Sequence, residues 1–113
     1  MSKKLNKIAY ELAKQMIEHG FELEHDENNW KEAQPTPSES VEYLDTHSLD
    51  EYGSWFLGID PEADPKDKAK FVYPFGDFKV VHKSALLEAE KRARMNKDHE
   101  IEQAAKRLLQ LIK

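Results

Sequence analysis

Apolar residues recur at helical spacing along the first twenty residues, with lysine and glutamate between them. The apolar positions are Leu5, Ile8, Leu12, Ala13, Met16 and Ile17. Gly20 follows, and glycine readily takes the left-handed conformation at a helix end. This pattern predicts an amphipathic helix from about Ser2 to His19. Phe21 and Leu23 then alternate with glutamates, which indicates a short strand.

The segment 70–94 reads KFVYPFGDFKVVHKSALLEAEKRAR, and its periodicity changes from that of strands to that of a helix. Aromatic and β-branched residues lie on both sides of a turn sequence that runs from Pro74 to Asp77. We therefore expect a short β-hairpin near residues 70–82. Ser84 suits the N-cap position of the helix that follows.

A further helical stripe of apolar residues lies in the C-terminal part of the sequence. Its members are Ile101, Ala104, Ala105, Leu108, Leu109 and Ile112. The segment 96–98 separates it from the preceding helix, and Asp98 suits an N-cap. Two helices joined so closely are expected to form an antiparallel hairpin. We expect this hairpin to bury Ile101, Leu108 and Leu109 against Leu5, Leu12 or Met16.

The middle of the chain predicts a polar loop followed by two helices. The loop covers about residues 24–37 and is rich in Asn, Pro and charged residues. Two capping-box sequences follow, one from Thr36 to Glu39 and one from Ser48 to Glu51. We expect the first helix to end near residue 47 and to bury Val41 and Leu44. The second is expected to run toward residues 55–57.

These elements predict one α+β domain, residues 1–113. It is mostly helical, with an amphipathic N-terminal helix, a C-terminal helical hairpin and the short β-hairpin. The net charge is −5 and is unevenly placed, because residues 21–66 carry thirteen acids and two lysines while both flanking segments carry an excess of bases. The sequence has no cysteine and no apolar run long enough to span a bilayer. The simplest interpretation is a cytoplasmic protein.

The sequence holds no motif that indicates catalysis. Histidine lies at positions 19, 25, 47, 82 and 99 without an HExxH pattern, and the four glycines are scattered. We therefore expect no catalytic residues, no cofactor and no metal site. A basic face with neighbouring aromatic residues could bind single-stranded nucleic acid. Its members are Lys79, Lys83, Lys91, Arg92, Arg94 and Lys97. Glu88 and Glu90 interrupt this face and the pI is about 5.5, so nucleic acid is not the expected partner.

One set of residues in roughly the C-terminal 45 positions forms a recognisable pattern: Tyr73, Pro74, Asp77, Val81, Ala85, Leu86, Ala89, Arg92, Ile101, Ala104, Ala105 and Leu108. This segment resembles small uncharacterised bacteriophage and prophage proteins. A similar segment lies beside head-assembly genes and in the tails of some head-maturation proteins. The likeness rests on structural residue types, and it implies no catalytic residue.

The expected function is that of a non-enzymatic adaptor or assembly factor that binds another protein. The expected binding surface is an exposed aromatic patch made by Trp55, Tyr73 and Phe75, although these side chains could equally form the core. Its rim would consist of Asp45, Asp50, Glu51 and Asp60. The alternative is an acidic inhibitor that mimics nucleic acid through residues 21–66. The oligomeric state stays open.

Overall fold

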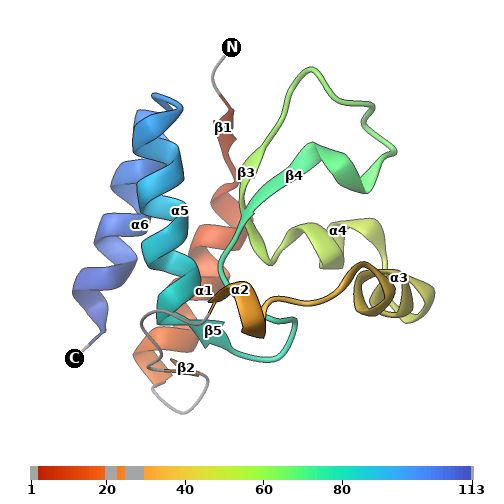
Figure 1. Ribbon diagram of the computed structural model, residues 1–113, viewed down its shortest axis with the longest axis horizontal. Coiled ribbons are helices and arrows are strands. Elements are labelled where there is room, and N and C mark those ends of the chain that lie inside the picture. Colours follow the sequence, from red (N-terminus) through yellow and green to blue (C-terminus); the bar gives the residue numbers. More distant parts are fainter. Residues whose placement is uncertain (1–2, 20–22, 25–29, 113) are drawn as a thin grey trace.

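Helices from both ends of the chain pack against a small antiparallel sheet in the computed structural model (Figure 1), which describes residues 3–19, 23–24 and 30–112. The fold is α+β and mostly helical, as predicted. In chain order the elements are β1 (Lys4–Leu5), α1 (Lys7–His19), β2 (Leu23–Glu24), α2 (Trp30–Ala33), α3 (Pro37–Thr46), α4 (Leu49–Gly53), β3 (Phe56–Ile59), the 3-10 turn η1 (Lys68–Lys70), β4 (Phe71–Pro74), β5 (Val81–His82), α5 (Lys83–Met95) and α6 (His99–Leu111).

The three-stranded sheet has the order β1-β3-β4, with both pairs antiparallel, so β3 is central and β4 is an edge strand. Gly58 pairs with Leu5 on one side and with Val72 on the other. A Cβ atom on Gly58 would lie 2.8 Å from the Tyr73 ring and 3.0 Å from Ile101, so the central strand needs a residue without a side chain there. This glycine lets α6 approach the sheet closely.

The first helix begins later than expected. Residues 4–5 form β1, and α1 starts at Lys7, while Ser2 and Gly20 lie outside the described residues. Asn6 explains the boundary, because its side-chain oxygen accepts a hydrogen bond from the Ala9 amide at 3.4 Å. Its amide group also donates to the carbonyl oxygens of Gly53 at 3.0 Å and Phe56 at 3.1 Å. Asn6 is therefore both a helix cap and a link between α1, α4 and β3.

The helix expected to reach residues 55–57 ends at Gly53 instead, and β3 follows from Phe56. The turn of the expected β-hairpin is present, since Gly76 and Val81 form an antiparallel bridge and the His82 amide donates to the Phe75 carbonyl at 3.0 Å. The strands on its two sides pair mainly elsewhere, however. β4 pairs with β3, and β5 pairs in parallel with β2, so the turn connects two sheets.

The C-terminal helical hairpin is confirmed. α5 and α6 pack along each other, and α1 packs on α6 (Figure 1). Ile101 and Leu108 are fully buried, and Leu109 is partly buried against the same core. Ser84 does not take the N-cap position, because α5 begins at Lys83 after His82 and Ser84 lies buried in the first turn.

Both predicted capping boxes form, from Thr36 to Glu39 and from Ser48 to Glu51. The burial expected for α3 is wrong for Val41, which is 50% exposed, and α3 has no buried residue. Figure 1 shows α3 at the far side of the molecule from α5 and α6. The short helix α2 lies within the predicted polar loop and buries Trp30, and residues 25–29 of that loop lie outside the described part.

Candidate functional site

The aromatic patch expected on the surface lies in the core. Trp55, Tyr73 and Phe75 are 7%, 8% and 0% exposed, and the rings of Trp55 and Phe75 stack with centroids 5.5 Å apart. Burial of large rings supplies much of a small core, so these residues stabilise the domain. The expectation that they form an exposed patch is therefore wrong.

The acids expected around that patch do not surround it. Asp45 lies on α3, while Asp50 and Glu51 lie on α4, and all three are exposed. Asp60 follows β3 and is half-buried, with its carboxylate 3.8 Å from the Lys3 ammonium. The hydrogen bond from the Ser48 amide lowers the pKa of Glu51, so this carboxylate serves helix capping.

A groove of about 840 Å³ lies between α5 and the edge strand β4, and α2 contributes to it. Its sheet side presents mainly apolar surface from residues that are only partly buried: Phe56, Phe71, Val72 and Pro74. The α5 side presents the small residues Ser84, Ala85 and Ala89. Small side chains opposite large rings leave open space between a helix and a strand, which is how this sequence produces a groove.

Charged groups of the groove are mostly cationic. In the part of the chain that the structure describes, they are Lys3, Lys31, Lys91 and Arg92, against the single carboxylate of Glu88. The Arg92 Nε donates to Glu88 Oε1 at 2.8 Å, whereas the side chains of Lys31 and Lys91 are exposed. The described lining of the groove is thus net positive on a chain of net charge −5, and a positive cleft favours the approach of anions.

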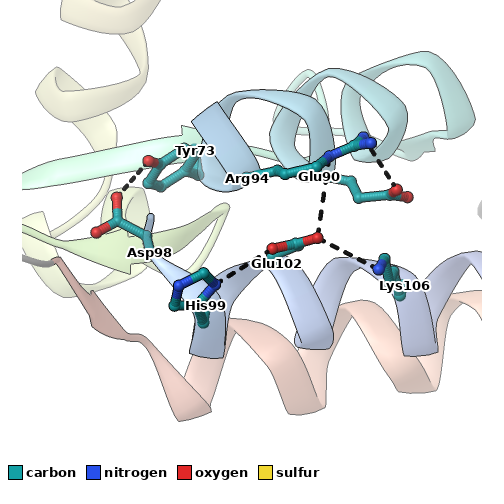
Figure 2. A network of polar contacts seen from close by, with 7 residues as sticks. All are labelled: Tyr73, Glu90, Arg94, Asp98, His99, Glu102 and Lys106. Carbon is teal, nitrogen blue, oxygen red and sulfur yellow. Dashed lines mark hydrogen bonds and ion pairs between the residues drawn. The ribbon is translucent and has the colours of Figure 1, made fainter. Parts of the chain in front are cut away.

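A hydrogen-bond network fixes one end of this groove, and Figure 2 shows its bond between Tyr73 and Asp98. The Tyr73 hydroxyl donates to Oδ2 of the buried Asp98 and accepts a hydrogen bond from the Asn96 amide at 3.0 Å. The backbone amide of Lys3 donates to Oδ1 of Asp98 at 2.8 Å. Asp98 occupies the N-cap position of α6, yet its carboxylate makes no capping bond. Tyr73, Asn96 and Lys3 all line the groove. Asp98 holds Lys3 and Tyr73 directly, and Tyr73 in turn holds Asn96.

Tyr73 also has unusual backbone geometry, with φ at 63°. A bulky residue in this region carries strain of order 1–3 kcal/mol and persists only where its surroundings hold it. Burial, together with the bond to Asp98, raises the pKa of its hydroxyl. The neutral tyrosine is thus the form that the groove contains.

A second set of polar contacts surrounds Glu102 on the α5–α6 hairpin (Figure 2). Its carboxylate lies 3.2 Å from Lys106, 3.6 Å from His99 and 3.9 Å from Arg94. Desolvation alone would raise the pKa of Glu102, but Lys106 and the other cations outweigh it and lower the pKa. The pair with Arg94 connects α5 to α6, whereas the contacts with His99 and Lys106 lie within α6. None of the four residues lines the groove.

His82 and Asp77 form a further pair, with His82 Nε2 3.0 Å from Asp77 Oδ2. The centroids of the His82 and Trp30 rings lie 5.4 Å apart, so the His82–Asp77 pair lies next to α2.

Within the described residues, no group of three or more His, Cys, Asp or Glu side chains could hold a metal ion. In the same part of the chain, no helix is both long and apolar enough to cross a membrane.

The groove was missed by sequence reasoning, although one signal was present. Ser84, Ala85 and Ala89 share one side of α5, where a core helix usually carries larger residues.

Comparisons of the chain with family models, with curated proteins and with solved structures gave no significant match.

Proposed function

We propose that this protein is a non-enzymatic adaptor or assembly factor that binds an acidic segment of another protein in the groove between α5 and β4. The observation that carries the proposal is the combination of an apolar sheet side with the exposed lysines Lys31 and Lys91 on a chain of net charge −5. Carboxylates on the ligand would pair with the lysines, and apolar side chains would cover the partly exposed rings.

A peptide suits this groove better than nucleic acid does. Glu88 lies inside the groove, and the excess of acids elsewhere repels a long polyanion. A short acidic peptide interacts mainly with the local positive charge. The partly buried Phe56, Phe71 and Pro74 also offer apolar surface to the apolar side chains of a peptide ligand.

Peptide titration tests the proposal. A fluorescent peptide in which Glu and Leu alternate should bind the wild-type protein, with an affinity that falls as salt is added. The double variant Lys31→Glu/Lys91→Glu should bind at least about tenfold more weakly, since it places like charges beside the ligand. Lys66→Glu/Lys79→Glu reverses two exposed lysines outside the groove; it is the control matched in charge and should bind normally. Equal binding by all three proteins, or preferential binding of single-stranded DNA, would refute the proposal.

A second candidate function is the acidic inhibitor that mimics nucleic acid. It is favoured by the exposed acids of α3 and α4, which include Glu42, Asp45, Asp50 and Glu51. Such an inhibitor would compete with DNA or RNA for a basic protein, and neutralising these four acids would abolish the competition. The groove variants would leave it unchanged, which distinguishes the two functions.

The proposed setting is the cytoplasm, in keeping with the absence of cysteine from the sequence. A bacteriophage or prophage origin is proposed as well, on the resemblance of the segment that contains Tyr73, Pro74 and Asp77. That segment forms β4 and the turn after it, beside the groove.

A further inference from the structure

Helix α3 presents a surface whose chemistry complements the groove. Ser38, Val41, Glu42 and Asp45 are all exposed and recur at helical spacing, so they share one face. The opposite face holds α3 on the domain through Tyr43, whose ring stacks on Phe78 with centroids 4.5 Å apart. The outer face thus combines two carboxylates with an apolar valine that is 50% exposed.

This face and the groove cannot meet within one molecule. No residue of α3 lines the groove, and Figure 1 shows α3 on the side of the molecule opposite α5. The groove offers groups that complement this face. They are the cations of the exposed Lys31 and Lys91, opposite in charge to the α3 carboxylates, and the partly exposed apolar side chain of Leu87. Two separate complementary surfaces on one chain favour contact between copies.

We propose that the groove accepts α3 of a second copy of this chain, with Val41 against the apolar side and Glu42 and Asp45 beside the lysines. This inference rests on the proposed function of the groove and names its occupant. Because the two surfaces differ, the contact is head-to-tail. In a pair of copies, one molecule still has a free groove and the other a free α3, so each can bind a further copy. Self-assembly is therefore open-ended unless the rotation between neighbours closes a ring.

Charge-reversal variants of the groove and of α3 distinguish this contact from association through other surfaces. One variant reverses the groove, Lys31→Glu/Lys91→Glu, and another reverses α3, Glu42→Lys/Asp45→Lys. A third chain carries all four substitutions. Lys66→Glu/Lys79→Glu and Glu11→Lys/Glu18→Lys reverse exposed charges outside both surfaces and serve as controls matched in charge. Equal thermal midpoints for all variants would establish that each is folded.

Sedimentation velocity over a range of protein concentrations is the measurement. The wild type and both controls should show a mass that rises with concentration and falls with added salt. Each double variant should associate at least about tenfold more weakly, and the fourfold variant should regain association because the complementarity is restored with opposite signs.

A wild type that stays monomeric at every concentration would overturn the inference, and so would a fourfold variant that fails to recover. The peptide titration distinguishes this failure from failure of the proposed function. If the Glu–Leu peptide still binds the monomeric wild type in a manner that depends on Lys31 and Lys91, the groove binds another acidic protein. If the peptide does not bind either, the proposed function fails as well.

Discussion

The hydroxyl of Tyr73 on β4 donates a hydrogen bond to the carboxylate of Asp98, at the junction between α5 and α6. The bond joins the edge of the sheet to the helical hairpin, and Asp98 is only 3% exposed. Tyr73→Phe should therefore lower the free energy of unfolding by about 1–3 kcal/mol, since it leaves a buried carboxylate oxygen without its partner. Urea denaturation measures the change. Tyr10→Phe, on a half-buried tyrosine of α1, should change it little, and equal effects of both substitutions would contradict the assigned role.

The same tyrosine predicts a loss of stability in alkali. Burial, followed by the bond to Asp98, raises the pKa of Tyr73 in the folded protein, and burial also raises that of Tyr52. A raised pKa means that the unfolded chain releases its proton first, so stability is complete below about pH 10 and decreases above it. Unfolding free energies measured at successive pH values should show this decrease, and Tyr73→Phe should make it smaller. A Tyr73→Phe variant with an unchanged alkaline decrease would rule out Tyr73 as a source.

Leu108 tests the packing of α6. Its side chain is fully buried in the core that α1 shares. Leu108→Ala should cost about 2–5 kcal/mol through lost burial and the cavity left behind. Leu87→Ala removes the same atoms from a side chain that is 37% exposed and should cost much less. Chemical denaturation compares the two, and similar midpoints would be incompatible with this arrangement of α6.

The lowered pKa of Asp77 leads us to expect a loss of stability in acid. Desolvation raises its pKa, but hydrogen bonds from the Val80 amide and from His82 outweigh that effect, and the net pKa is lowered. A carboxylate whose pKa is lowered in the folded state stabilises the fold at pH values above its pKa in the unfolded chain, which is near 4. This stability is lost as the pH falls through the folded-state pKa. Asp77→Asn should make the thermal midpoint less dependent on pH below about 4. An acid profile identical to that of the wild type would exclude Asp77.

Local sequence signals predicted the helices well. The capping boxes at Thr36 and Ser48 act over three residues, and the stripe around Leu108 needs only a helix with one apolar side. Strand β3 was missed because its sequence FLGI is too short to show a period. Its strand conformation depends on pairing with residues 4–5 and 71–74, which no local pattern reveals.

The candidate site could be predicted only in part. The cations Lys91 and Arg92 stood out in the sequence, but Lys3 and Lys31 join them only through the packing of distant elements. Burial of Trp55 and Phe75 could not be decided from the sequence, because aromatic residues suit a core and an interface equally. The groove itself arises where small residues of α5 face β4, and this is a tertiary relationship.

The bond from the Lys3 amide to Asp98 joins residues 95 positions apart, and β1 pairs with a strand more than fifty residues away. Contacts of such long range require large loops to close, which slows folding relative to a helical bundle held by local contacts. α1 is synthesised before α6, yet it packs on α6 in the folded protein. Until α6 has been synthesised, Ala13, Met16 and Ile17 of α1 therefore lack part of the core that covers them in the folded protein. The partly synthesised chain is most prone to aggregate at this stage.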